Sequence, residues 1–422
     1  MSLHQLATEA RHACLTLKRS DGATRNAFLR ALAASLRARA ADIAAANAGD
    51  LTAAAAAGLS PAMLDRLRLD GGRIEALAGD VEAVIALPDP LAGVEAERVM
   101  PNGLRLQQRR VPIGVLGVIY EARPNVTIDV AAVAIKTGNA AVLRGGKEAL
   151  ATNRSLVQCV HAALEQAGLP AQAIAFIDDP DRGEVLKLLQ LDSLIDLIIP
   201  RGGAELHAFC RREARMPVIT GGIGICHLYV DAAADLDRAL PVIRNAKVQR
   251  PTVCNALDTV LVHRAVADAF LPRLAADLLP LGVSLRCDPA ALARLQPLTA
   301  QHPAQISAAG PGDFDREWLS LVLGVRVVDT AEDAMQHIEA HSSGHSDGIL
   351  SADAELAEAF LARIDSAAVY WNASTRFTDG GQLGLGAEVA VSTQKLHARG
   401  PMGLRELTSY KWVAIGDYHV RA

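Results

Sequence analysis

The hydrophobic residues in the first ninety positions of the chain recur with the period of a helix. Between Asn26 and Asn47, one broad stripe carries Phe28, Leu29, Leu32, Leu36 and Ile43, with arginines between them. Such a stripe is typical of an amphipathic helix with one buried face. The alanine run Ala53–Ala57 follows, and because alanine is the best helix former, we expect helix that ends near Gly58. Prolines and a glycine between residues 88 and 93 then predict a break.

Two short strands are expected after this break. The segment Glu97–Pro112 carries Pro101-Asn102-Gly103 at its centre, a sequence that favours a hairpin turn between two exposed strands. The longest uninterrupted apolar stretch, Val111–Tyr120, is about half of the roughly 20 residues that a membrane span needs. It is typical of a buried parallel strand.

From this point short runs rich in β-branched residues alternate with helical segments. The first series of expected strands is Gly114–Tyr120, Ala140–Leu143, Ala173–Ile177, Leu194–Ile199 and His227–Val230; helices are expected at Val126–Thr137, Glu148–Gln166 and Ala204–Arg212. A second series is Asp258–Val262, Leu323–Val328, Gly348–Leu350 and Ala367–Trp371. Strand, helix and strand at this spacing predict an α/β chain with two open parallel sheets.

Composition and charge exclude several classes of protein. Half of the 422 residues are hydrophobic, which excludes a disordered chain, and 42 Lys and Arg against 47 Asp and Glu leave no basic face for a nucleic acid. Charges run through residues 1–26, so we expect neither a signal peptide nor a membrane segment. The six cysteines show no metal-ligand spacing. We therefore expect a metal-free enzyme of the reducing cytoplasm, with free thiols.

Two glycine pairs follow expected strands where helices begin. They are Arg144-Gly145-Gly146-Lys147 and Arg201-Gly202-Gly203, and the ordinary G-x-G-x-x-G fingerprint is absent. Free N–H groups at a helix start and a neighbouring cation can hold phosphate. A tight turn that only needs small residues is the alternative for each pair. Two such turns together favour an anionic cofactor.

A cysteine and an asparagine stand in connections, where catalytic groups concentrate. Cys254 lies in Gln249-Arg250-Pro251-Thr252-Val253-Cys254-Asn255 just before an expected strand; a buried structural thiol is the alternative to a nucleophile. Asn125 follows the first parallel strand. Its side chain is placed either to cap the next helix or to donate a hydrogen bond to an oxyanion.

A long polar, glycine-rich stretch between residues 371 and 403 is interpreted as a functional loop. Its Arg, Asp and Glu side chains are suited to a zwitterion, and a solvated surface loop is the alternative. With Arg123 beside Asn125, the candidate substrate-binding residues are Arg123, Arg376, Asp379, Glu388 and Arg399.

These motifs, in this order, resemble the γ-glutamyl phosphate reductase family of the aldehyde dehydrogenase superfamily. The most specific are Val118–Asn125, Ile199–Gly203, the Gln249–Asn255 segment and Leu383–Gly403. The resemblance implies an aldehyde-dehydrogenase-like fold in three parts. Residues 1–97 and 113–229, with part of 380–398, would bind the cofactor NADP(H); 230–379 would carry the nucleophile; 98–112 and 399–422 would form an oligomerisation element, so we expect a homo-oligomer.

The resemblance also implies roles for individual residues. Cys254 would be the nucleophile and Asn125 the oxyanion donor, whereas Arg144 and Lys147 would contact the adenosine ribose and its phosphate. Gly145, Arg201, Gly202 and Gly203 join the candidate cofactor-binding residues, and Glu317 would hold the nicotinamide ribose. Hydrolytic members carry a glutamate before a glycine pair. Here Thr220 precedes Gly221-Gly222, so water activation is not expected.

The reaction implied is the NADPH-dependent reduction of L-glutamate 5-phosphate to L-glutamate 5-semialdehyde and phosphate through a cysteine thioester, the second step of proline biosynthesis. Functional coupling to glutamate 5-kinase follows from the same resemblance. Two alternatives stay open. One is another oxidoreductase of the superfamily that acts on a different small aldehyde, and the other is a catalytically silent binding protein on that fold.

Overall fold

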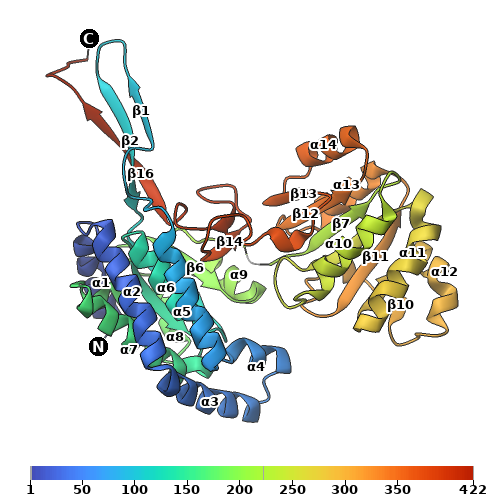
Figure 1. Cartoon of the computed structure of the whole chain (residues 1–422), viewed down its shortest axis with the longest axis horizontal. Coiled ribbons are helices and arrows are strands. Elements are labelled where there is room, and N and C mark those ends of the chain that lie inside the picture. Colours follow the sequence, from blue (N-terminus) through green and yellow to red (C-terminus); the bar gives the residue numbers. More distant parts are fainter. Residues whose placement is uncertain (1, 222, 422) are drawn as a thin grey trace. The chain divides into compact units, whose positions relative to one another are not determined.

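The computed structural model describes residues 2–221 and 223–421. The chain divides into two compact units, shown in Figure 1. The first comprises Met1–Thr220, Gly384–Ala390 and Met402–Ala422, and the second comprises Gly221–Leu383 and Val391–Pro401. Gly222, one of the two glycines in the segment that lacks a carboxylate, lies outside the described residues.

The first unit is built on a parallel four-stranded sheet in the order β5-β4-β3-β6. Its strands are β3 (Val115–Tyr120), β4 (Ala140–Gly145), β5 (Ile174–Phe176) and β6 (Leu197–Arg201). Every residue of β3 and β4 is buried, as expected for apolar runs covered on both faces of a parallel sheet. The four strands expected here are confirmed, with ends shifted by up to three residues.

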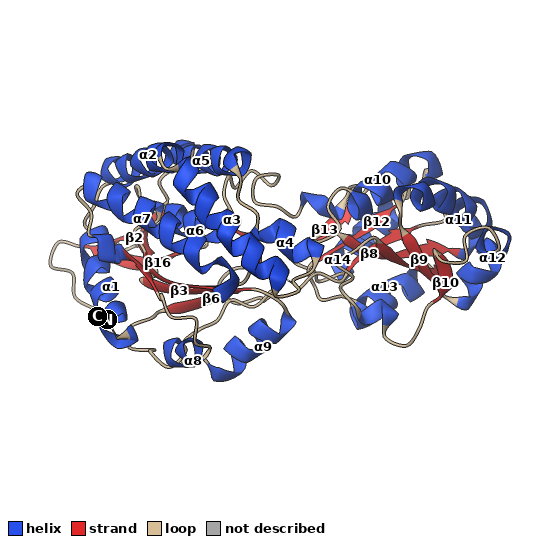
Figure 2. Ribbon diagram, turned by 90° about the horizontal axis from the view of Figure 1, so that it is seen from below, coloured by secondary structure: helices blue, strands red, loops and turns tan. Residues whose placement is uncertain are grey.

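Helices cover both faces of this sheet. They are α1 (Leu3–Leu17), α2 (Gly22–Ala38), α3 (Ala40–Ala56), α4 (Pro61–Leu67), α5 (Gly71–Ala86), α6 (Asn125–Lys136), α7 (Leu150–Gln166), α8 (Gly183–Leu188) and α9 (Ala204–Glu213). Figure 2 shows α8 and α9 on the opposite side of the sheet from α2 and α5. The parallel strands β3, β4 and β6 all end at the edge where the loops to α6, η1 (Lys147–Ala149) and α9 begin.

The predicted stripe over Asn26–Asn47 spans two helices. The chain leaves the helical conformation at Arg39 (φ −106°, ψ 17°), and α3 starts at the next residue. The five stripe residues Phe28, Leu29, Leu32, Leu36 and Ile43 are buried as the pattern indicates. Both α2 and α3 pack on α7, however, which a continuous straight helix does not allow over this length. The end of α3 agrees with the sequence, since Gly58 (φ +80°) follows it.

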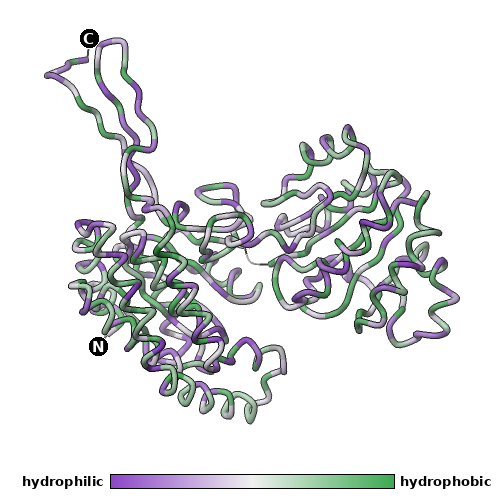
Figure 3. Tube along the Cα trace, in the orientation of Figure 1, coloured by the Kyte–Doolittle hydropathy of each residue, from purple (hydrophilic) through white to green (hydrophobic). Residues whose placement is uncertain are grey.

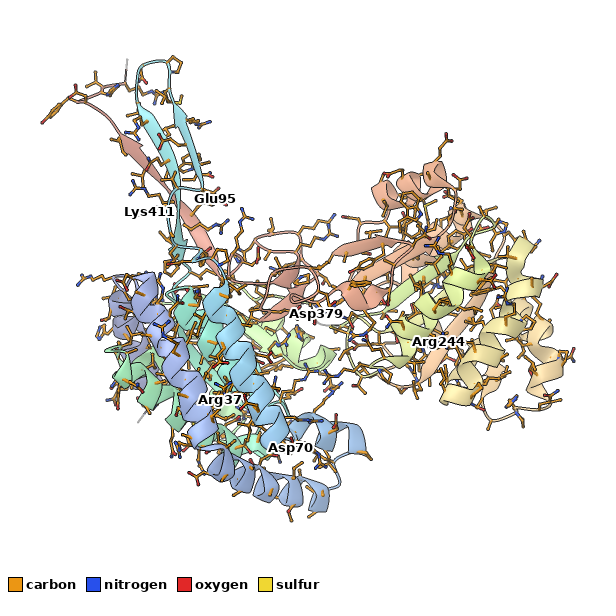
Figure 4. All side chains as sticks on the ribbon, viewed as in Figure 1. Arg37, Asp70, Glu95, Arg244, Asp379 and Lys411 are labelled. Atoms are coloured by element: carbon orange, nitrogen blue, oxygen red, sulfur yellow. The ribbon has the colours of Figure 1, made fainter. Side chains whose placement is uncertain are left out.

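An antiparallel extension of three strands belongs to the first unit. Its strands are β1 (Ala96–Val99), β2 (Arg105–Pro112) and β16 (Thr408–Ile415), in the order β1-β2-β16. Figure 4 labels Glu95 and Lys411 on this extension. The carboxylate of Glu95 accepts from Arg110 at 2.9 Å and also contacts Arg405, which ties the segments that lead into β1 and β16 to β2 at one end of the extension. The predicted hairpin is confirmed, and residues 408–415 of the expected oligomerisation element form the strand β16 that pairs with it.

The second unit holds a parallel sheet of seven strands in the order β10-β9-β11-β8-β7-β12-β13. The strands are β7 (Cys226–Val230), β8 (Leu257–His263), β9 (Ser284–Cys287), β10 (Ile306–Ala308), β11 (Val322–Val328), β12 (Ser346–Leu350) and β13 (Ala368–Trp371). Figure 3 shows hydrophobic residues along its central strands.

Two hydrophobic clusters lie on the two faces of this sheet. The larger one joins the strands to α10 (Leu236–Val248), α11 (Arg264–Leu278) and α12 (Pro289–Thr299). The smaller one joins them to α13 (Ala331–His341) and α14 (Ala354–Arg363). The sheet is therefore the middle layer of three, as α/β folds require.

The structure corrects three sequence expectations here. The strand that we placed in the first series, His227–Val230, is part of β7 and pairs with β8 and β12 of the second sheet. The division between the units accordingly falls after Thr220 and not after residue 229. The strands β9 and β10 were not expected. The strand β9 is short, and buried residues alternate in it with partly exposed ones, whereas β10 has only three residues.

The stretch between residues 371 and 403 is only partly a loop. It contains the short helix η5 (Thr375–Phe377) and two paired strands, β14 (Ala390–Ser392) and β15 (Gly400–Met402). In the part of the chain that the structure describes, no helix combines the length and the apolar character of a membrane span.

Candidate active site

Cys254 lies in the loop between α10 and β8 of the second unit, a loop that spans residues 249–256. It is partly exposed, whereas the other five cysteines are buried. Burial raises the pKa of those five thiols, to about 12 for Cys210 and Cys287. Because the thiolate is the reactive form, buried thiols of raised pKa are poor nucleophiles. Accessibility thus selects Cys254 among the six.

The backbone of Cys254 is packed directly against Gly224, in the segment that leads into β7. A Cβ atom at Gly224 would stand 1.4 Å from the carbonyl oxygen of Cys254, so only glycine allows this approach. The Cys226 thiol donates to the same carbonyl at 3.3 Å. Gly224 and Cys226 therefore hold the main chain of Cys254 in place, and its side chain is the part that is exposed.

A buried ion pair supports the end of this loop. The side chain of Lys247 is completely buried, donates to the carbonyl of Leu257 at 2.8 Å, and lies 3.7 Å from the carboxylate of Asp258. Asp258 also accepts the N–H groups of Cys226 and Trp318, at 3.5 and 3.1 Å. Burial raises the pKa of Asp258 to about 6 although Lys247 opposes the rise.

The residue after Cys254 is held by the polar segment at 374–379. The Asn255 amide donates to the Thr378 carbonyl at 2.9 Å, and the Thr375 hydroxyl donates to the Asn255 carbonyl at 2.7 Å. Arg376 contacts the amide oxygen of Asn255 and donates to Gln249 at 3.0 Å. A candidate substrate residue, Arg376, is thus bonded to the loop that carries Cys254.

The remaining candidates of the second unit lie in different surroundings. Glu317 accepts the N–H of Gly224 at 3.0 Å, so its carboxylate is beside the backbone that supports Cys254. Asp379 is exposed and closes its own turn by accepting the N–H of Gly381 at 2.9 Å. Arg399 is paired with Asp365 at 2.6 Å. Arg376 and Glu317 therefore contact the thiol loop or its support directly.

In the first unit, Asn125 begins α6 directly after the turn that ends β3. Ala122 in this turn has φ +41°, a backbone conformation that residues other than glycine rarely adopt. Its N–H donates to Glu148 at 2.6 Å. Asn125 is not a helix cap: the cap position is Pro124, and no side chain caps this helix. Its amide instead donates to Asp129 at 2.9 Å. The capping alternative is therefore wrong.

The first glycine turn is closely packed. A Cβ atom at Gly145 would stand 2.2 Å from the Asn153 amide, and one at Gly146 would stand 2.1 Å from the Glu148 carboxylate. Arg144 is 8% exposed and donates to the carbonyls of Gly145 and Pro180, both at 3.0 Å. Lys147 is exposed. Within this turn, the cation open to solvent is therefore Lys147.

The second glycine turn leads into α9. The N–H of Gly203 donates to the Glu121 carboxylate at 3.3 Å, and a Cβ atom at Gly202 would stand 2.5 Å from the same carboxylate. Arg201 is the last residue of β6 and is partly buried. Of the other candidates in this unit, Arg123 and Glu388 are both partly buried.

A groove of about 570 Å³ lies at the same sheet edge, within the first unit. Its lining includes Glu121, Arg144, Arg182, Val185, Leu206 and Phe209, from the ends of β3 and β4 and from α8 and α9. The carboxyl edge of a parallel sheet is the usual ligand crevice of an α/β fold. A lining that combines apolar side chains with a few charged groups suits a nucleotide.

Sequence reasoning missed several residues that the structure brings to these places. Lys247, Asp258 and Cys226 support the thiol loop, Asp129 holds Asn125, and Leu206 and Phe209 line the groove. Lys247 has one apolar neighbour on each side but stands between Arg244-Asn245 and Gln249-Arg250, so no local signal in the sequence points to its burial.

Comparisons with known proteins agree with this fold and these motifs. The model of the aldehyde dehydrogenase family matches residues 2–292. The chain is 56% identical over 423 residues to a γ-glutamyl phosphate reductase of Roseiflexus castenholzii, and the match covers 100% of both chains. A solved γ-glutamyl phosphate reductase of Thermotoga maritima is 41% identical, with a TM-score of 0.95 and 100% of both chains covered.

A more distant structure shares the fold alone. The acetylating aldehyde dehydrogenase of Geobacillus thermoglucosidasius is 18% identical, with a TM-score of 0.72 over 99% of this chain and 97% of that one. The family match over more than half of the chain and the full-length identity to named relatives settle the classification. The chain belongs to the aldehyde dehydrogenase family and, within it, to the γ-glutamyl phosphate reductases.

Proposed function

We propose that the enzyme reduces L-glutamate 5-phosphate to L-glutamate 5-semialdehyde and phosphate with NADPH, through a thioester on Cys254, as the second step of proline biosynthesis. The observation that carries the proposal is Cys254 itself: the partly exposed thiol of the chain lies on a loop whose backbone is fixed by Gly224 and Cys226. The names of the full-length relatives support the choice of substrate.

The first step is attack of the Cys254 thiolate on the acyl carbon of the substrate. A C–S bond forms, the C–O bond to the phosphoryl group breaks, and phosphate leaves with the electron pair. The tetrahedral intermediate carries a negative oxygen. Asn125 and the N–H of Cys254 are the donors that we assign to it, and one such donor is worth about 3 kcal/mol of barrier.

The cofactor supplies a hydride to the thioester carbonyl when it is bound. The groove of the first unit fits a nucleotide, with Leu206 and Phe209 on its apolar wall and Arg144 and Arg182 among its cations. The exposed Lys147 at the first glycine turn is the cation that we assign to the 2′-phosphate of NADPH. Collapse of the hemithioacetal then breaks the C–S bond and frees the aldehyde.

Thr220 stands before Gly221-Gly222, at the position where hydrolytic family members carry the glutamate that activates water. We infer from this difference that hydride transfer to the thioester competes with slow hydrolysis, as an enzyme fed by an acyl phosphate requires. Of the substrate-binding candidates, we assign the amino-acid end of the substrate to the segment around Arg376 and Asp379. Arg123, Glu388 and Arg399 stay candidates for the same role.

We further propose that the extension of β1, β2 and β16 joins subunits into a homo-oligomer. Its outer strands β1 and β16 each have one edge without a partner strand among the described residues, and Trp412 and Val99 on them are 52% and 64% exposed. Open edges with exposed apolar side chains invite pairing. The free cysteines agree with a cytoplasmic location, where glutamate 5-kinase would supply the labile acyl phosphate.

The test is NADPH consumption by the purified protein in the presence of glutamate kinase, ATP and glutamate. We expect consumption that requires all three components and that yields phosphate and the semialdehyde in equal amounts. Failure of this assay, together with NADP-dependent oxidation of another small aldehyde in phosphate-free buffer, would assign the chain to a different reaction of its family.

A further inference from the structure

The amide of Asn125 has a single described partner, the carboxylate of Asp129. Both residues are on α6, one turn apart, and Nδ2 of Asn125 donates to Oδ2 of Asp129 at 2.9 Å. Residues at this spacing share one face of a helix. Because the Asn125 side chain does not cap the helix, this contact is the interaction that orients its amide.

We infer that Asp129 is a positioning residue for the reaction: its carboxylate holds the Asn125 amide with the NH₂ end in place, so that the second N–H of that group stays available to the oxyanion. The inference rests on the proposed function, in which Asn125 is the oxyanion donor. Asp129 does not touch the substrate in this scheme and acts only through Asn125.

The chemistry of the two groups makes the orientation depend on charge. An ionised carboxylate accepts hydrogen bonds and donates none, so it pairs only with the NH₂ end of an amide. A protonated carboxyl carries a hydrogen that it can donate to the oxygen end. Protonation of Asp129 therefore permits the Asn125 amide to rotate by half a turn, so that its oxygen accepts from the Asp129 carboxyl. The N–H that would donate to the oxyanion is then no longer held in place.

The surroundings of Asp129 bring this change of charge into the neutral range. Burial is the main cause that raises the pKa of Asp129, to about 7, and the charge of Asp80 on α5 raises it further. Arg201 at the end of β6 and the Asn125 amide act in the opposite direction. The protonated, flip-permitting form is thus populated below neutral pH.

The first arm of the experiment is a double-mutant cycle in the coupled NADPH assay. We expect Asn125→Ala to lower kcat by about 10²–10³-fold, the effect of one lost oxyanion donor. Asp129→Ala should lower kcat by about tenfold, the size of a coupling between residues in contact. In the Asn125→Ala background the second substitution should change kcat by less than about twofold, because its target is gone.

The second arm measures the pH dependence of kcat. If Asp129 only stabilised the fold, its substitution would not shift this pH profile. Asp80 contacts neither Asn125 nor the reacting groups in our assignment, and Asp80→Asn removes one charge that raises the pKa of Asp129. The acidic limb of the profile should therefore move to lower pH in Asp80→Asn, with kcat unchanged on the alkaline side. In Asp129→Asn, which cannot ionise, this limb should be lost while the KM for NADPH stays the same.

Each outcome decides the matter. Independent, multiplying effects of the two alanine variants, or an acidic limb that Asp80→Asn leaves in place, overturn the role of Asp129 while the reductase activity stands. An Asn125→Ala enzyme of full activity removes the donor role itself. A wild-type enzyme without NADPH consumption overturns the proposed function and this inference with it. Thermal unfolding of every variant separates these results from a loss of the folded state.

Discussion

The buried pair of Lys247 and Asp258 gives a prediction whose size follows from the structure. The substitution Lys247→Met keeps the length of the side chain and removes its charge. The Leu257 carbonyl then loses its donor, which costs about 1–3 kcal/mol. Asp258 is left in the interior with no counter-charge, and loss of one partner of a buried pair costs about 3–5 kcal/mol in total.

The loss should depend on pH in a defined direction. The pKa of Asp258 is about 6 in the folded protein, above its ordinary value of 3.8. For such a group the folded state is favoured while the carboxyl is protonated, and this contribution is lost as pH rises through the folded pKa. Lys247 is the charge that holds this pKa down, so its removal raises the pKa further. The substitution should therefore lower the free energy of unfolding more at pH 8 than at pH 5.

Thermal unfolding of the second unit is the assay, followed at pH 5 and pH 8. At roughly 2–4 °C per kcal/mol for a unit of this size, we expect the midpoint at pH 8 to fall by about 10 °C. The matched control is Lys395→Met, because Lys395 lies in the same unit and forms a pair with Asp365 in which its own side chain is 71% exposed; such pairs contribute at most about 1 kcal/mol. Equal midpoints for the two variants at pH 8, or a larger loss at pH 5, would refute the reasoning. Activity of Lys247→Met should also fall, because the loop that carries Cys254 loses the ion pair that holds its end in place.

Four further predictions concern the reaction and the assembly. Cys254→Ser should keep cofactor binding in a fluorescence titration and retain less than about a tenth of the turnover, because an alcohol is a far poorer nucleophile than a thiolate. Lys147→Ala should raise the KM for NADPH far more than the KM for NADH; equal changes would take Lys147 away from the 2′-phosphate. In the reverse direction, NADPH formation from the semialdehyde should stall without phosphate and resume with phosphate or arsenate, and sustained turnover without either anion would reveal a water-activating base. Deletion of the residues after Ser409 should release monomers or insoluble protein, and a native mass of one subunit for the intact chain, by light scattering, is the contradicting result.

The parallel core of the first unit could be predicted because its signal is local. The strand β3 is apolar throughout, β4 is apolar up to Arg144, and both are buried on both faces, so their composition distinguishes them. The hairpin could be predicted for the same reason, since Asn102-Gly103 favours its turn and Gly103 adopts φ +86° there.

The assignment of strands to sheets was not local. The strand β7 has the same apolar character as the strands of the first unit, and only its pairing with β8 and β12 places it in the second. The strand β10 has three residues and is recognisable as a strand only through its partner β9. Edge strands carry too short a pattern for their composition to distinguish them from loops.

For the site, the sequence by itself determined which residues are chemically able to act. A thiol three residues after Arg-Pro and an asparagine after an expected strand are both visible in the sequence. Tertiary structure decided the rest, because accessibility and hydrogen-bond partners are properties of the packed chain. It made Cys254 the partly exposed thiol, gave the amide of Asn125 to Asp129 instead of a helix cap, and bound Arg144 to backbone carbonyls. The charges that support the site, Lys247 and Asp258, are eleven residues apart in the chain and become a pair only because α10 packs against β8 in the interior.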